Sequence, residues 1–156
     1  MISHKRLGEI LVEKGLISQE RLREALEEQQ KTKEFLGRLL IKNYGVKERD
    51  LLEALGEQFN MSVVSLKARY IDWKLVRKFS SSLVFDYKCI PLCRDERSIT
   101  VAITNPLDLM TIKIAEEEAL KLALELKLVL TTEADVEDVI QRYKKYIKGD
   151  ISNILE

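Results

Sequence analysis

The chain has 156 residues, which suits one domain or two small ones of about 60 and 90 residues. Lysine and arginine together number 26, as do aspartate and glutamate. This balance argues against a binder of nucleic acid or anionic membranes, because such proteins carry a basic stripe. A small anionic ligand needs only one or two cations and remains open.

The N-terminal sequence MISHKRLGE has no apolar signal core, and no stretch approaches the roughly 20 apolar residues of a membrane span. We therefore expect a soluble cytoplasmic protein without direct membrane insertion. The sequence predicts no nucleic-acid partner.

A tandem repeat dominates the N-terminal part of the chain, since residues 6–29 recur in weaker form at residues 35–58. The offset of 29 positions aligns five pairs: Leu7 with Leu36, Gly8 with Gly37, Leu11 with Leu40, Leu22 with Leu51 and Gln29 with Gln58. A repeat of this size is one supersecondary unit used twice, because a single unit would leave its apolar face in water. We predict two similar half-sites related by approximate twofold pseudosymmetry.

Helical periodicity extends to about residue 60. In the first repeat, Gly15 ends one helix and Ser18 is the expected N-cap of the next, while Gly45 separates the helices of the second repeat. The second helix is expected to bury one set of side chains: Leu22, Ala25, Leu26 and Gln29. Two helical hairpins follow.

The pattern changes after residue 60 to short strands alternating with helices. The expected elements, in order, are a β-rich segment 62–66, short helices 72–79 and 82–88, strands 89–93 and 98–104, a helix from the turn 105–108 to about 124, a strand 126–130, and a helix from Thr132 to about 147. The predicted fold class is α+β. A helical tandem-repeat subdomain, residues 1–60, precedes a small α/β subdomain with a short-stranded sheet, residues 61–147, and a tail or linker, residues 148–156.

Two cysteines and one histidine limit redox and metal chemistry. In an extended segment Cys89 and Cys93 would lie about 13 Å apart on one face, too far for a disulfide. We expect reduced, partly buried thiols. A metal site would need further cysteine or histidine partners, and His4 is the only histidine, so no metal site is predicted.

No catalytic constellation can be assembled from the sequence. The phosphate loop GxxxxGK[ST], the GxSxG elbow and the HExxH zinc motif are missing from it. Acidic runs such as residues 116–118 are typical of solvated helix faces. We therefore predict no catalytic residues, no resident cofactor and no enzymatic activity in this segment.

The repeated glycines and glutamines allow two interpretations. Gly8 and Gly37 either permit close helix packing or let a flat ligand approach the backbone at a helix N-terminus. In the second case Gln29 and Gln58 would offer amide hydrogen bonds to a base edge, and Arg6 a planar fork suited to phosphate or guanine.

The first repeat resembles the MshEN domain, which stands at the N-terminus of assembly ATPases of type II secretion and type IV pili. The residues that match, without a gap, its motif RLGxxφφxxGφφxxxxLxxxLxxQ, where φ is apolar, are Arg6, Leu7, Gly8, Leu11, Val12, Gly15, Leu16, Ile17, Leu22, Leu26 and Gln29. The strand at 90–92, the strand at 101–103 and the turn at 105–108 are also similar to that family. The resemblance covers nearly all of residues 5–147.

This resemblance implies that cyclic di-GMP is a regulatory ligand bound through two such motifs. The first half-site would comprise Arg6, Leu7, Gly8, Leu11, Val12, Gly15, Leu22, Leu26 and Gln29. The second would comprise Leu36, Gly37, Leu40, Ile41, Leu51, Leu55 and Gln58. The second motif departs from the pattern at Phe35, which stands where Arg6 does, and at Tyr44, which replaces a glycine.

The resemblance also implies partners, namely the cytoplasmic domain of an inner-membrane secretion or pilus component and an ATPase motor in cis or in trans. Aromatic anchors for docking would come from residues 61–147, where Trp73, Phe79, Phe85 and Tyr87 are candidates, although each of them could instead fill the core. The alternative is a protein-interaction module of the same fold that docks but binds no nucleotide.

Overall fold

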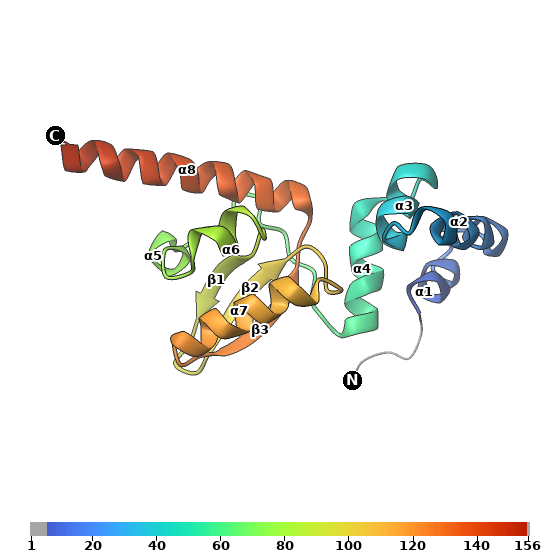
Figure 1. Ribbon diagram of the computed structural model, residues 1–156, viewed down its shortest axis with the longest axis horizontal. Helices are drawn as coiled ribbons and strands as arrows, with labels where there is room; N and C mark the ends of the chain where they lie inside the picture. Colours follow the sequence, from blue (N-terminus) through green and yellow to red (C-terminus); the bar gives the residue numbers. More distant parts are fainter. Residues whose placement is uncertain (1–5, 156) are drawn as a thin grey trace. The chain divides into compact units, whose positions relative to one another are not determined.

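The computed structural model describes residues 6–155, with side chains for residues 6–150, and it forms two compact units, Met1–Ser62 and Val63–Glu156. The α+β class is confirmed. The described part of unit 1 is helical, with α1 (Leu7–Glu13), α2 (Gln19–Thr32), α3 (Leu36–Asn43) and α4 (Glu48–Phe59), as Figure 1 shows. These are the two predicted hairpins.

Contacts in unit 1 follow the repeat. Helix α1 packs against α4, and α2 packs against α3. Exchanging the two repeats exchanges α1 with α3 and α2 with α4, so these two contacts are equivalent, as the predicted twofold pseudosymmetry requires.

The turn inside each hairpin depends on a glycine. Gly15 has φ +73° and Gly45 has φ +71°, a left-handed conformation that glycine adopts without a steric penalty. Helix α3 is one residue longer than α1, so Gly45, and not Tyr44, is the structural counterpart of Gly15. The turn after Gly45 is one residue shorter, which restores the offset of 29 at the N-caps Ser18 and Lys47.

Unit 2 consists of a three-stranded sheet and four helices among the residues that the structure describes. They are α5 (Trp73–Val76), α6 (Ser81–Phe85), β1 (Ile90–Arg94), β2 (Ser98–Ile103), α7 (Leu109–Lys121), β3 (Glu125–Leu130) and α8 (Glu133–Leu155). The sheet order is β1-β2-β3, with β1 antiparallel and β3 parallel to β2. The parallel pair is joined by α7, and Asp108 caps this helix by accepting a hydrogen bond from the Thr111 amide at 3.1 Å.

The prediction that Cys89 and Cys93 share one face is wrong. A register shift between Pro91 and Cys93 interrupts the pairing of β1 with β2, which leaves Cys89 buried and Cys93 exposed. Proline cannot donate a ladder hydrogen bond and occurs in edge strands or at bulges, and β1 is an edge strand. Both thiols are free, as predicted.

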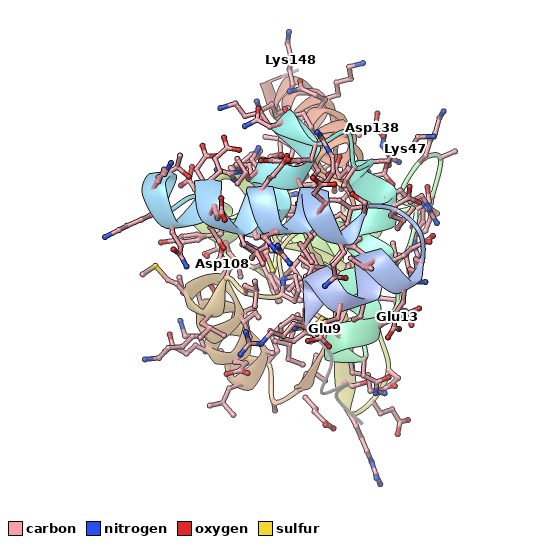
Figure 2. The ribbon with its side chains drawn as sticks, turned by 90° about the vertical axis from the view of Figure 1, so that its right-hand side faces the viewer. Glu9, Glu13, Lys47, Asp108, Asp138 and Lys148 are labelled. Atoms are coloured by element: carbon pink, nitrogen blue, oxygen red, sulfur yellow. The ribbon has the colours of Figure 1, made fainter. Side chains whose placement is uncertain are left out.

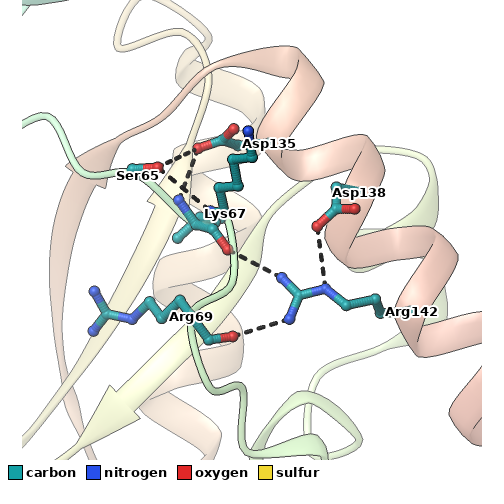
Figure 3. Close-up of polar contacts among 7 residues, drawn as sticks. Ser65, Lys67, Arg69, Asp135, Asp138 and Arg142 are labelled. Atoms are coloured by element: carbon teal, nitrogen blue, oxygen red, sulfur yellow. Dashed lines mark hydrogen bonds and ion pairs between the residues drawn. The ribbon is translucent and has the colours of Figure 1, made fainter.

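Segment 62–66 is not a strand. Val63 forms a single parallel bridge to Leu130, and the Val64 amide donates to the Leu130 carbonyl at 2.8 Å. Side chains of α8 hold the residues that follow, as Figure 3 shows. Asp135 accepts a hydrogen bond from the Leu66 amide at 2.7 Å, and Arg142 donates to the carbonyls of Leu66 and Arg69 at 3.0 and 2.9 Å.

The predicted end of the last helix near residue 147 is also wrong, because α8 continues through Gly149 to Leu155. A glycine inside a helix costs only about 1 kcal/mol relative to alanine, too little to end a helix supported on both sides. Beyond Gly149, Asp150 forms an ion pair at 2.9 Å with Arg77, next to α5. Figure 1 shows α8 as one uninterrupted helix beside α5 and α6.

Candidate functional site

Burial divides the predicted site residues into three groups. The buried ones are Leu7, Gly8, Leu11, Leu22, Gly37, Leu40, Leu51 and Leu55. The half-buried ones are Val12, Gln29, Leu36 and Gln58, and the exposed ones are Arg6, Gly15, Leu26 and Ile41. The first group holds the helices together, so a ligand that binds this conformation contacts the other two groups.

The motif glycines pack against leucines of their own repeat. A Cβ on Gly8 would lie 2.9 Å from both δ-carbons of Leu22, and a Cβ on Gly37 would lie 2.8 Å from a δ-carbon of Leu51. Such distances are shorter than real Cβ contacts, so a larger residue would require the leucine side chain that it meets to shift. The close-packing interpretation of these glycines therefore holds in this conformation.

The first positions of the two motifs have the same backbone and different side chains. Arg6 and Phe35 are the N-caps of α1 and α3, both extended, and their carbonyls accept hydrogen bonds from Ile10 and Leu39 at 3.2 Å. Arg6 is exposed. The ring of Phe35 turns back onto Gly37, where a Cβ would lie 2.7 Å from its Cε1.

Apolar side chains exposed on unit 1 belong to the motifs. Leu26 is 41% exposed and Ile41 is 39% exposed, the two exposed large hydrophobic residues among those that the structure describes in this unit. The prediction that Leu26 is buried is therefore wrong. Its counterpart Leu55 is only 1% exposed, so the two half-sites differ here too. Exposed apolar side chains of this kind suit contact with the flat face of a ligand.

Gln29 connects the two motifs. Its Nε2 donates to the backbone carbonyl of Glu34 at 3.2 Å, directly before Phe35. Both Gln29 and Gln58 are half-buried.

Two contacts between the repeats were not predicted. The Tyr44 hydroxyl donates to Glu28 at 2.8 Å, and Lys14 forms an ion pair with Glu57 at 2.8 Å. The hydrogen bond to Glu28 raises the pKa of Tyr44, and the hydrogen bond to Glu57 raises the pKa of Lys14. The sequence signal was present, since Glu28 and Glu57 recur at the offset of 29.

Further polar contacts strengthen the Tyr44 end of this arrangement. Asn43 donates to the second carboxylate oxygen of Glu28 at 3.0 Å, and the Arg21 guanidinium lies 4.8 Å from the centre of the Tyr44 ring. Helices α2 and α3 are thereby joined by both oxygens of one carboxylate. Figure 2 labels Glu9 and Glu13, two exposed glutamates of α1 that lie about one helical turn apart.

A shallow hollow of about 460 Å³ lies in unit 2 and not at the motifs. It is lined by Asp95, Glu96, Arg97, Ser98, Glu125 and Lys127. The Asp95 carboxylate accepts bonds from the Arg97 amide and from the amide and hydroxyl of Ser98, and these bonds lower the pKa of Asp95. This carboxylate therefore shapes the β1–β2 turn and is not poised for chemistry.

The part of the chain that the structure describes holds no group of three histidine, cysteine or carboxylate side chains that suits a metal ion. His4 lies outside the described residues. Among residues 6–155, no helix combines the length and apolar character needed to cross a membrane.

Comparison with known families gives one match. The sequence profile of the MshEN domain matches residues 59–149, more than half of the chain. This match lies almost entirely in unit 2, outside the tandem repeat.

Curated relatives are pilus motors. The chain is 27% identical over 158 aligned residues to the type IV pilus assembly ATPase PilB of Myxococcus xanthus, covering 97% of this chain and 27% of the relative. It is 29% identical over 118 residues to PilB of Thermus thermophilus, covering 74% of this chain and 13% of that relative. The chain thus spans about a quarter or less of the length of these relatives.

Solved structures extend the similarity to both units. MshE solved with cdg, the cyclic dinucleotide cyclic di-GMP, has a TM-score of 0.80 at 26% identity, covering 90% of this chain and 99% of that one. The N-terminal domain of XpsE has a TM-score of 0.66 at 19% identity, covering 91% and 98%, and shows the fold alone.

Proposed function

Because the chain belongs to the MshEN domain family, we propose that it is a regulatory and docking domain of a bacterial type II secretion or type IV pilus assembly ATPase system, and that unit 1 binds cyclic di-GMP. The observation that carries this proposal is the similarity to MshE solved with that dinucleotide. This similarity covers 90% of the chain and so extends into the tandem repeat.

The residues left accessible in unit 1 suit such a ligand chemically. Arg6 offers a guanidinium to phosphate or to the acceptor edge of guanine. Leu26 and Ile41 offer exposed apolar contacts to base faces, and the half-buried amides of Gln29 and Gln58 both donate and accept. The buried leucines and both motif glycines then position these groups without contacting the ligand.

Calorimetric titration of the whole chain with cyclic di-GMP tests the proposal. We expect saturable binding that weakens about tenfold or more in Arg6→Ala, the size expected for a lost charge-assisted hydrogen bond. Leu26→Glu should weaken binding as well, while circular dichroism stays unchanged because Leu26 is exposed.

The matched control is Arg49→Ala. Arg49 is an exposed arginine on α4, two positions from Leu51 and so about 200° around the helix from that motif leucine. Its removal should leave the affinity unchanged. Absence of heat at high micromolar dinucleotide would refute nucleotide binding and leave the docking-only alternative.

Docking of unit 2 to the cytoplasmic domain of an inner-membrane component is the second part of the proposal. The expected aromatic anchors are not favoured, since Phe79 is buried and both Trp73 and Phe85 stack on Tyr143 at centroid distances of 5.5 and 5.6 Å. Exposed apolar side chains occur instead at the start of α7, where Leu109 and Met110 are 74% and 65% exposed.

A pull-down tests the docking part. Leu109→Glu combined with Met110→Lys should abolish capture by the cytoplasmic domain of the cognate membrane protein, because charges would replace the exposed apolar surface. Retained capture would reject this surface. On this proposal the protein acts in the cytoplasm without chemistry of its own, and hydrolysis of ATP belongs to a motor in cis or in trans.

A further inference from the structure

The two half-sites of unit 1 present the same backbone and different chemistry at their first position. Arg6 and Phe35 are both extended N-caps, with φ/ψ of −76°/155° and −61°/129°, and each accepts one hydrogen bond at 3.2 Å from the amide four residues on. Their Cα–Cβ bonds therefore leave equivalent helices in similar directions. One half-site presents an exposed guanidinium there, and the other a half-buried phenyl ring.

An arginine at this position distinguishes purines and a phenylalanine does not. Guanine offers two acceptors, O6 and N7, to the two donors of a guanidinium, whereas adenine replaces the first acceptor with an amino donor. A bidentate arginine contact thus favours guanine by roughly ten- to a hundredfold. A phenyl ring stacks on any base, since every base has a π-face.

The remaining polar group of the second half-site is also compatible with both purines. Gln58 is half-buried and carries both a donor and an acceptor. A side-chain amide pairs bidentately with the N6 and N7 atoms of adenine, and it can also donate a single hydrogen bond to O6 or N7 of guanine. The second half-site, as built, contains no motif side chain that requires guanine.

We propose that the first half-site selects guanine and the second accepts either purine, so that a mixed guanine–adenine cyclic dinucleotide is a ligand of this protein alongside cyclic di-GMP. This inference rests on the proposed binding of cyclic dinucleotides to unit 1. It adds base selectivity, which follows from the difference between Arg6 and Phe35.

Titration of the whole chain with three dinucleotides tests the inference: cyclic di-GMP, 3′,3′-cyclic GMP-AMP and cyclic di-AMP. We expect the first two to bind with affinities within fivefold of each other and cyclic di-AMP to bind at least tenfold more weakly. If none binds, the proposed function itself fails. If cyclic di-GMP binds and the mixed dinucleotide is at least fivefold weaker, or cyclic di-AMP binds as well as the mixed one, only the selectivity inference is overturned.

Variants at the first position provide a second measurement. Phe35→Arg restores a donor fork and should raise the preference for cyclic di-GMP over the mixed dinucleotide at least fivefold. Phe35→Leu keeps an apolar side chain over Gly37 and should weaken both ligands equally, which keeps the test usable if Phe35→Arg does not fold. Arg49→Ala should change neither affinity, and an unaltered preference in folded Phe35→Arg would refute the role of this position.

Discussion

Lys14 and Tyr44 are structural counterparts, because each caps the C-terminus of the first helix in its repeat and each contacts the same glutamate position of the opposite repeat at 2.8 Å. Lys14 meets Glu57, and Tyr44 meets Glu28. The pseudosymmetry of unit 1 thus includes its polar contacts, even where a cation in one half is a phenol in the other.

The first prediction concerns the pKa of Tyr44. Because the hydrogen bond to Glu28 raises this pKa above its ordinary value of 10.0, the contact stabilises unit 1 fully below pH 10 and loses its effect as the pH rises through the folded-state pKa. Glu28→Gln removes the charge and should lower the Tyr44 pKa, measured by NMR titration of the tyrosine ring carbons. Glu27→Gln, at an exposed neighbouring position, is the control, and equal pKa values in both variants would contradict the prediction.

A second prediction concerns the contact of Gly8 with Leu22. Gly8→Ala should lower the stability of unit 1 by up to about 2 kcal/mol, since overpacking costs about 1–3 kcal/mol and the better helix propensity of alanine returns about 1 kcal/mol. Native-state hydrogen exchange of α1 and α2 amides measures the change.

Two further variants separate packing from propensity. In the double variant with Leu22→Ala the cost of Gly8→Ala should disappear, because the colliding δ-carbons are gone. Gly149→Ala, where the added Cβ meets nothing within 4 Å, should stabilise α8 instead. Equal effects of the two alanines would show that Gly8 has no packing role.

The cysteines give a third prediction. Cys89 is fully buried, and burial raises the pKa of its thiol to about 12, whereas Cys93 is exposed. At pH 8 the native protein should therefore react with iodoacetamide quickly at one thiol and at the other only as fast as the fold opens. Mass spectrometry locates the label. Cys93→Ser should remove the fast phase, and two equally fast thiols would contradict the burial of Cys89.

Elements of this fold were predictable wherever local signals decide them. Ser18, Asp72 and Asp108 all act as N-caps. A short polar side chain directly before a helix accepts hydrogen bonds from the free amides of its first turn, and this contact depends only on neighbouring residues. Gly15 and Gly45 mark their turns for a similar local reason.

Burial of individual site residues was not predictable, because it depends on which neighbouring element covers them. Leu26 and Leu55 are identical residues at equivalent positions of the two repeats, yet Leu26 is exposed and Leu55 is buried. The same limit applies to Gly149, which α8 passes through with support from the distant Arg77. Pro91 was a sequence signal for the bulge in β1, because proline occurs in edge strands and at bulges. The exposure of Cys93, however, follows only from the pairing register of β1 with β2.

The last prediction concerns the segment that follows unit 1, which α8 holds through Arg142. Its guanidinium donates to the carbonyls of Leu66 and Arg69 at 3.0 and 2.9 Å and lies 3.2 Å from Asp138 (Figure 3). Arg142→Met removes both donors and keeps the aliphatic stem, so we expect the Arg69 amide, which bonds to Leu66, to exchange at least tenfold faster.

The size of that effect depends on how well the hydrogen bonds of Arg142 are shielded from water. A hydrogen bond from a charged donor contributes about 1.5–3 kcal/mol when shielded, and Arg142 is about one-third exposed, so the lower part of that range applies. Lys145→Met, at an exposed position of α8, controls for the loss of a positive charge. Asp135→Asn should accelerate exchange at Leu66 more than at Arg69, because Asp135 accepts from the Leu66 amide. Unchanged protection of residues 66–69 in Arg142→Met would mean that the bridge to Leu130 and the Asp135 contact hold this segment without Arg142.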